Sequence, residues 1–176
     1  MQQLKERILR EGRVLPGNII KVDGFLNHRV DTALMRDLAD EFAKYFDVKN
    51  ITMVLTAEAS GIALATICAE RYGVPMVFAK KAKSDNIEGG LYQSEIFSYT
   101  YKKKVTLLVA QDWLKPEDKV LIIYDRAVLD DKAYISDAQF AKTLAHFGKT
   151  EQEVLAGYDA VLHLVTCAKG AEFAYN

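Results

Sequence analysis

The sequence predicts an α/β domain in which a twisted, mainly parallel sheet is flanked by helices. Residues 51–56 and 120–124 are continuous apolar runs, which are typical of strands covered on both faces. Between residues 51 and 79 the pattern runs strand, turn, helix and strand, a βαβ unit whose two strands lie parallel. A chain of 176 residues, 50% of them hydrophobic, is long enough to bury its own core as a single domain.

The first elements are indicated by apolar residues at helical spacing. Leu4, Ile8 and Leu9 fit one face of a short charged helix, and residues 19–22 form a short strand-like run. Asp31 is the expected N-cap of the next helix. The apolar side of that helix carries residues three or four apart, namely Leu34, Leu38, Phe42 and Tyr45.

The βαβ unit comes next. Its first strand is residues 51–56, and its helix is residues 62–72, which Gly73 ends. Its second strand is residues 76–79. The unit predicts a parallel sheet with helices on its faces.

A hairpin and a second apolar strand follow the βαβ unit. Residues 93–100 and 105–110 are strand-like runs on either side of a turn, so they predict a hairpin that projects from the sheet. We expect Trp113 to pack near the end of this hairpin. The strand at 120–124 then returns to the sheet and ends at Asp125.

Two capping boxes organise the last part of the chain. Ser136 and Gln139 predict the start of a helix that runs to residue 147, and Thr150 and Glu153 repeat the pattern for a short helix. An apolar run at 160–166 predicts a last strand.

Composition excludes several classes of protein. The chain has 23 Lys and Arg against 24 Asp and Glu, a net charge of −1, which argues against a basic nucleic-acid-binding surface. Its two cysteines and three histidines never fall at metal-ligand spacing, and the cysteines are typical of a reducing compartment. No apolar run approaches the roughly 20 residues that span a bilayer, and the N-terminus is charged. We therefore expect a cytoplasmic protein without a membrane partner.

Ligands of open parallel sheets bind at the carboxyl ends of the strands, and two such ends carry suggestive residues. Glu58, Ala59, Ser60 and Gly61 lead from a strand into a helix, where backbone N–H groups can bind phosphate or pyrophosphate. The alternative is a plain tight turn. Asp125 could hold sugar hydroxyls or Mg²⁺, or it could be a helix cap or surface acid.

Two further segments could contribute to a site. Lys80, Lys81 and Lys83 follow a strand end and could meet an anionic substrate, or they could belong to a solvated loop. The amide of Asn27 can pair with a donor and an acceptor on a planar heterocycle, or Asn27 could be an ordinary turn residue. We expect the neighbouring His28 to be a packed side chain.

From residue 1 to about residue 123 the chain resembles the bacterial xanthine phosphoribosyltransferases, a type I phosphoribosyltransferase family. The matching stretches run in order along the chain: LKERILREG, IIKVDGFLNHRVD, DEFA, TAEASGIALA, YGVPMVFAKKAKS, EIFSYT and KVLII. The resemblance implies a homodimer that acts in purine salvage. It implies the joining of xanthine to phosphoribosyl pyrophosphate with Mg²⁺, which gives xanthosine monophosphate and pyrophosphate.

The resemblance also implies roles for individual residues. Ile20 and Asn27 occupy the positions that contact the purine base. The segment from Glu58 to Gly61, including Ala59 and Ser60, occupies the loop that faces pyrophosphate, and Lys81 lies in the family's basic stretch. Asp125 is the remaining member of an acidic pair that holds the ribose hydroxyls.

The chain departs from the family after residue 123. Tyr124 replaces one acid of the pair, and the following loop lacks Gly and Thr but carries Asp130 and Asp131, which would repel a 5′-phosphate. We therefore expect impaired catalysis. The alternative is a catalytically dead fusion product that at most binds a purine or dimerises.

The last part of the chain carries a second resemblance. From about residue 120 to residue 176 it resembles the C-terminal part of a P-loop ATP-binding family, although the chain has no G-x-x-x-x-G-K-[ST] loop. This leaves an ATPase remnant as a further alternative. We divide the predicted single domain into a phosphoribosyltransferase-like part, 1–123, and a divergent part, 124–176.

Overall fold

The computed structural model describes residues 2–15, 19–82, 89–98, 103–124 and 136–157. The chain forms two compact units, one made of residues 1–123 and 165–176 and the other of residues 124–164. The first unit contains every strand of the described residues. In the described ranges, no helix is both long enough and apolar enough to cross a bilayer.

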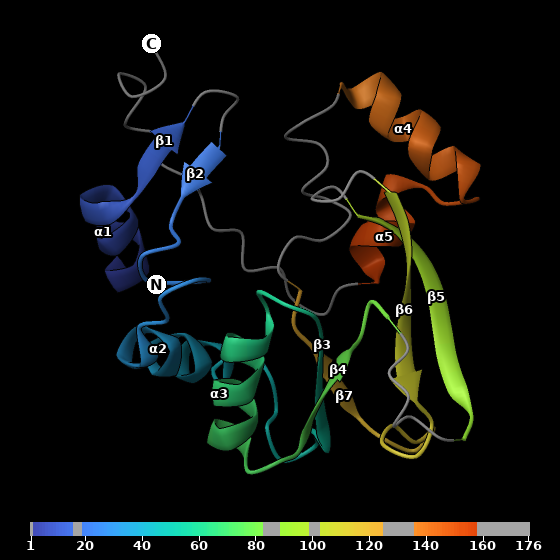
Figure 1. The fold of residues 1–176 in the computed structure, drawn as a ribbon, viewed down its shortest axis with the longest axis horizontal. Helices are drawn as coiled ribbons and strands as arrows, with labels where there is room; N and C mark the ends of the chain where they lie inside the picture. The colour runs from blue at the N-terminus through green and yellow to red at the C-terminus, as the bar shows by residue number, and fades with distance from the viewer. Residues whose placement is uncertain (1, 16–18, 83–88, 99–102, 125–135, 158–176) are drawn as a thin grey trace. The chain divides into compact units, whose positions relative to one another are not determined.

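A three-stranded parallel sheet lies at the centre of the first unit (Figure 1). β3 (Met53–Ala57) is the middle strand and pairs with β4 (Met76–Ala79) on one side and β7 (Val120–Ile122) on the other. α3 (Ile62–Tyr72) connects β3 to β4, which confirms the predicted βαβ unit. β7 is shorter than the predicted strand at 120–124, because the ladder with β3 ends at Ile122.

The helices of this unit start and stop at the residues expected from their caps. Gly73 ends α3 in the left-handed conformation, with φ 69°. α2 (Thr32–Phe42) begins at Asp31, whose carboxylate accepts hydrogen bonds from the backbone N–H groups of Ala33 and Leu34. The prediction for Tyr45 was wrong: the helix ends before it, so the helical spacing no longer applies and its side chain is 63% exposed.

Two clusters of buried side chains form the core of the first unit. One lies between the sheet and α3, and includes Val54, Cys68 and Leu121. The other joins α1 (Gln2–Glu11) and α2 around Phe25. Two side chains of α3, Leu64 and Ile67, pack against both clusters, so this helix links the two.

The packing of α1 corrects one prediction. Leu4 and Ile8 are buried as expected, but Leu9 is 53% exposed. Neighbouring residues of a helix point about 100° apart, so Leu9 cannot follow Ile8 into the same contact.

Two antiparallel ribbons complete the first unit. β5 (Leu91–Ser98) pairs with β6 (Lys103–Ala110) as the predicted hairpin, and a backbone bridge between Lys80 and Leu108 joins it to the end of β4. β1 (Arg13–Leu15), which was not predicted, pairs with β2 (Ile19–Lys21). A run of three residues is too short to show a period of two.

Trp113 lies in the turn after β6, near the hairpin end as expected, but its predicted packing was wrong. Its side chain is 70% exposed. A turn held by a hydrogen bond from Trp113 N to Ala110 O fixes the backbone there without burying the indole.

The second unit contains two short helices with the predicted caps. α4 (Asp137–His146) starts at Ser136 and α5 (Glu151–Ala156) starts at Thr150, each with a complete capping box. The predicted strand at 160–166 lies outside the described residues.

Candidate functional site

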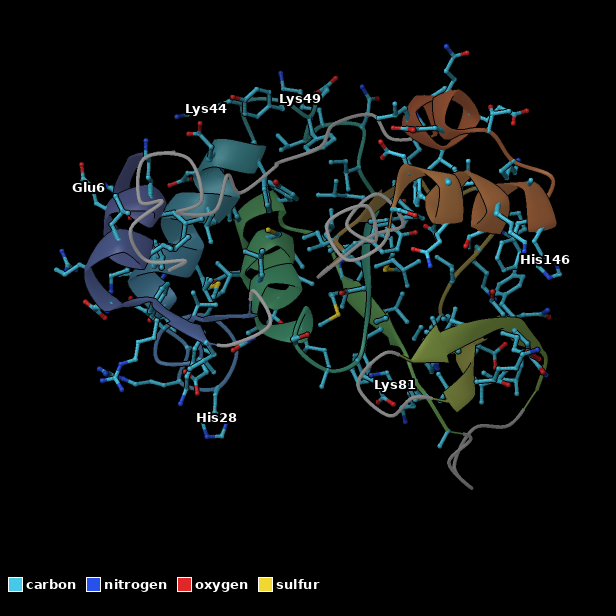
Figure 2. The ribbon with its side chains drawn as sticks, turned by 90° about the horizontal axis from the view of Figure 1, so that it is seen from above. Glu6, His28, Lys44, Lys49, Lys81 and His146 are labelled. Carbon is cyan, nitrogen blue, oxygen red and sulfur yellow. The ribbon has the colours of Figure 1, made fainter. Side chains whose placement is uncertain are left out.

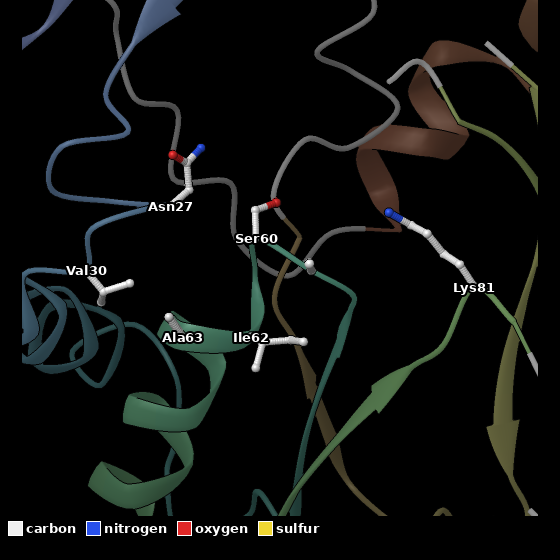
Figure 3. Close-up of a pocket in the computed structure, with 7 residues that line it drawn as sticks. Asn27, Val30, Ser60, Ile62, Ala63 and Lys81 are labelled. Carbon is white, nitrogen blue, oxygen red and sulfur yellow. The ribbon is translucent and has the colours of Figure 1, made fainter. Parts of the chain in front are cut away.

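A pocket of about 630 Å³ lies in the first unit, beside the residues that follow β3 and β4. Its lining residues come from the loop before α2, the turn between β3 and α3, the first turn of α3, and the residue pair after β4 (Figure 3). They are Asn27, Val30, Ala59, Ser60, Ile62, Ala63 and Lys81. Four residues singled out from the sequence, Asn27, Ala59, Ser60 and Lys81, are therefore brought to one pocket.

The turn between β3 and α3 contributes Ala59 and Ser60 to the pocket lining. Glu58 N donates to Ala79 O at 3.0 Å, and Ile62 N donates to Ala59 O at 3.2 Å. The peptide bond between Glu58 and Ala59 is cis. At a helix start the first N–H groups lack partners within the helix, and Gly61, the N-cap, has no side chain to cap them. The start of α3 is thus suited to an anionic ligand.

Gly61 allows α3 to start close to β3. A Cβ atom at this position would lie 2.3 Å from Thr56 Oγ1, far inside van der Waals contact. Thr56 is buried, and its hydroxyl donates to the carbonyl of Ile123 at 2.9 Å. Sequence reasoning missed Thr56 because it stands in an otherwise apolar strand. The signal was a single hydroxyl side chain followed, five residues later, by glycine.

Glu58 joins the two loops that flank the pocket. Its carboxylate Oε1 accepts a hydrogen bond from the backbone N–H of Lys81. The Lys81 side chain extends from the end of β4 toward the turn that carries Ser60 (Figure 3). Lys80, the preceding residue, is fixed by its two backbone hydrogen bonds with Leu108, each 2.9 Å. Lys81 therefore leaves a well-held strand end, whereas Lys83 lies outside the described residues.

Asn27 lies in a loop that is tied to itself by backbone hydrogen bonds. Asp23 O accepts from His28 N at 3.3 Å and from Arg29 N at 2.9 Å. Val30, near the end of the loop, both lines the pocket and packs against the α1–α2 core cluster. The amide of Asn27 is exposed at the mouth of the pocket.

Three other sequence-based expectations have different outcomes. His28 was expected to be packed, but it is exposed and points away from the ribbon (Figure 2), since the loop turns its neighbour Asn27 to the pocket. The backbone of Ile20 pairs with Val14 in the β1–β2 ribbon, and its side chain is outside the described part. Asp125 lies outside the described residues.

The described residues hold no group of three or more His, Cys, Asp or Glu side chains that could bind a metal ion. Mg²⁺ is usually held by one or two carboxylates together with substrate phosphates and water, not by a protein cage.

Curated relatives are similar to this chain along most of its length. The xanthine phosphoribosyltransferase of Ruminiclostridium cellulolyticum is 43% identical over 157 residues, which are 89% of this chain and 78% of that protein. The one from Lachnoclostridium phytofermentans is 50% identical, over 71% of this chain and 64% of that protein. The one from Streptococcus pneumoniae serotype 4 is 45% identical, over 82% of this chain and 70% of that protein.

Solved structures of adenine phosphoribosyltransferases share the fold. The enzyme from Giardia lamblia, complexed with 9-deazaadenine, has a TM-score of 0.51 at 24% identity, and covers 65% of this chain and 63% of its own. The enzyme from Trypanosoma brucei, in complex with AMP, pyrophosphate and ribose-5-phosphate, has a TM-score of 0.53 at 17% identity, over 97% of this chain and 92% of its own. The predicted α/β fold of the type I phosphoribosyltransferases is confirmed.

The comparisons also bear on the last part of the chain. No protein-family model matches the chain. An alignment of 157 residues in a chain of 176 must extend past residue 123 wherever it begins, so the likeness to the Ruminiclostridium protein reaches into the part that sequence reasoning set apart. The resemblance of residues 120–176 to a P-loop family gains no support from these relatives.

Proposed function

Because the chain belongs to the xanthine phosphoribosyltransferase family, we propose that its pocket binds xanthine and phosphoribosyl pyrophosphate for purine salvage. One observation carries this proposal: Asn27, Ser60 and Lys81, from three separate segments, line the same pocket at the carboxyl side of the sheet. Asn27 offers an amide to a heterocycle, while Ser60 and Lys81 offer donors to an anion.

The reaction joins a ring nitrogen of xanthine to the anomeric carbon of the ribose as the bond from that carbon to pyrophosphate breaks. The bonding pair leaves with pyrophosphate, and the proton of the ring nitrogen is released to water. Positive charge develops on the ribose ring and negative charge on the departing pyrophosphate. The N–H groups at the start of α3 and the Lys81 ammonium would stabilise the leaving group, where fixed donors are most effective. Val30, Ile62 and Ala63 would contact the flat faces and edges of the bound substrates.

The proposal includes an Mg²⁺ ion that would bind together with the diphosphate of phosphoribosyl pyrophosphate. When bound there, it would supply positive charge against the negative charge that develops on the leaving group. The Oε1 atom of Glu58 accepts from Lys81 N, so this carboxylate links the two loops beside the pocket. Asp125, which follows the strand predicted at residues 120–124, is the residue that we propose to hold the ribose hydroxyls.

A homodimer and a cytoplasmic location complete the proposal. Both rest on the family resemblance, and the location also rests on the isolated cysteines, which are typical of a reducing compartment.

We also propose that turnover is slow. Tyr124 stands where the family has an acid, and Asp130 and Asp131 would repel a 5′-phosphate. A fixed donor or charged clamp typically contributes about 3 kcal/mol to transition-state stabilisation, so its loss lowers the rate by two to three orders of magnitude. The second candidate, a protein that binds a purine without turnover, is supported by the same substitutions.

A transferase assay tests these proposals. Purified protein is mixed with xanthine, phosphoribosyl pyrophosphate and Mg²⁺, and xanthosine monophosphate is measured by mass spectrometry, with Lys81→Ala as the site control. We expect slow product formation that Lys81→Ala abolishes. Product at ordinary enzyme rates would refute the impairment. Xanthine binding by calorimetry without any product would favour the non-catalytic candidate, and absence of both would overturn the proposed function.

A further inference from the structure

A single arginine of α1 contacts both ends of the loop that carries Asn27. The guanidinium carbon of Arg7 lies 5.5 Å from the centre of the Phe25 ring, in cation–π geometry. Arg7 Nη2 lies 3.2 Å from Asp31 Oδ2, and Arg7 Nε lies 2.9 Å from Glu11 Oε2. The arginine therefore bridges α1, the start of the loop and the N-cap of α2.

The two loop residues that Arg7 contacts, Phe25 and Asp31, are the anchors of this loop. Phe25 is 1% exposed and lies in the α1–α2 core cluster. Asp31 N donates to Phe25 O at 3.0 Å, which closes the segment between them. The two oxygens of the Asp31 carboxylate have different partners. Oδ1 accepts hydrogen bonds from the backbone N–H groups of Ala33 and Leu34, and Oδ2 pairs with Arg7.

Residues between these anchors form one wall of the pocket. Asn27 and Val30 both line it, and Leu26 and Val30 pack against the same core cluster as Phe25. A shift of either anchor would therefore move the Asn27 amide. No residue of α1 is among the described pocket-lining residues, so Arg7 itself does not line the pocket, and the loop is its contact with the pocket wall.

We propose that Arg7 is a positioning residue, which holds the Asn27–Val30 wall in the geometry that binds the purine base. The inference deepens the proposed function and rests on it. It assigns a base-specific role to a side chain outside the pocket. The planar guanidinium can stack on Phe25 and pair with two carboxylates at once, which a lysine ammonium cannot do equally well.

Arg10 provides a matched control on the same helix. Its Nη2 pairs with the other carboxylate oxygen of Glu11 at 3.1 Å, and its side chain is exposed. Its Nε also donates to that Glu11 oxygen, at 3.2 Å, so the guanidinium is turned to Glu11 and away from the two loop anchors. Arg10→Gln therefore removes one positive charge and one Glu11 pair from α1 while it leaves both loop anchors in place.

The first experiment measures KM for each substrate in Arg7→Gln, Arg7→Lys, Asp31→Asn and Arg10→Gln. Arg7→Gln should raise KM for xanthine by about five- to tenfold, the combined effect of a lost cation–π contact and a lost ion pair. KM for phosphoribosyl pyrophosphate should stay within about twofold, since the start of α3 and Lys81 are untouched. Arg7→Lys should restore part of the loss. Asp31→Asn, which keeps a good N-cap, should show a smaller loss of the same kind.

A second measurement does not depend on activity. Hydrogen exchange should rise in the peptide that spans residues 23–31 in Arg7→Gln and should stay unchanged there in Arg10→Gln. Residues 91–98 of β5, which belong to neither core cluster, serve as the internal reference. If the wild-type chain neither binds nor converts xanthine, the proposed function fails, and hydrogen exchange still decides whether Arg7 holds the loop. Equal losses for both substrates, or equal exchange in the two arginine variants, would overturn the positioning role.

Discussion

Gly61→Ala gives the sharpest test of how the start of α3 packs against β3. The backbone of Gly61 has φ −71° and ψ −18°, which alanine adopts without strain. Replacing glycine at such a position normally stabilises a protein by about 0.4–1 kcal/mol, through the unfolded state. Here the new Cβ would lie 2.3 Å from Thr56 Oγ1, so we expect the opposite sign.

The expected magnitude follows from what must move. Ordinary contact begins at about 3.4 Å, so the Thr56 hydroxyl would have to shift by about 1 Å and would leave the carbonyl of Ile123. Overpacking of a buried site costs about 1–3 kcal/mol, and the lost hydrogen bond costs about 1 kcal/mol. After the gain from the unfolded state, Gly61→Ala should lower the free energy of unfolding by about 2 kcal/mol.

Thr56→Ala removes the clashing atom and makes the prediction specific. In that background the Gly61→Ala Cβ has as its nearest neighbours the Cβ of residue 56 at 3.6 Å and Ala57 O at 3.7 Å, which are ordinary contacts. The same substitution should then be neutral or stabilising, so the double-mutant cycle should show a coupling of about 2 kcal/mol.

Urea unfolding of the four proteins, followed by circular dichroism, measures this cycle. Gly73→Ala is the matched control, because Gly73 has φ +69° and a Cβ added to it would meet no atom within 4 Å. Its cost of about 1 kcal/mol arises from backbone strain and should be the same in both backgrounds. Equal costs of Gly61→Ala with and without Thr56 would refute the steric account.

Three further predictions concern other parts of the chain. Burial raises the pKa of the Cys68 thiol to about 12. In a Cys167→Ser variant, Ellman's reagent at pH 8 should therefore react with Cys68 only after the protein is unfolded in guanidinium. Rapid labelling of the native protein would contradict this prediction. Hydrogen bonds from the backbone of Leu34, and then the charge of Arg7, hold the pKa of Asp31 below its usual value. The contribution of the Asp31 carboxylate to stability is present above its unfolded pKa and is lost as the pH falls through its lower folded pKa. Asp31→Asn should therefore reduce the difference between the urea midpoints measured at pH 6 and at pH 3. Ser136→Ala should lower stability by about 1 kcal/mol in the unit that contains α4, whereas Ser136→Asp should not, as chemical denaturation can show.

The parts of the fold that the sequence predicts well are those fixed by local chemistry. Both ends of α3 and of β4 match the predicted residues, because Gly73 and Pro75 interrupt the apolar runs between them. Burial is harder to predict, since it depends on partners that are distant in sequence. Leu9 and Tyr45 have apolar side chains at apparently helical spacing, yet both are exposed.

The candidate site shows the same division. The rule that ligands meet the carboxyl ends of parallel strands singled out Ser60, and Lys81 was singled out because it follows a strand end. The structure brings both to one pocket with Asn27. The spacing of Thr56 and Gly61 was the only local signal for Thr56, because its role depends on the contact between β3, the segment after β7 and the start of α3. The link between Glu58 and Lys81 spans 23 residues and depends on the parallel pairing of β3 with β4. The roles of Ile20 and Asp125 stay predictions.

The position of α3 between the two core clusters has a consequence for how ligands affect the whole unit. Leu64 and Ile67 pack against both clusters, so loss of packing in one cluster would uncover side chains that also cover the other. A ligand that binds at the start of α3 would therefore protect the sheet and the α1–α2 layer together. Its effect on thermal unfolding should be a shift of one shared transition, with no separate melting of either layer.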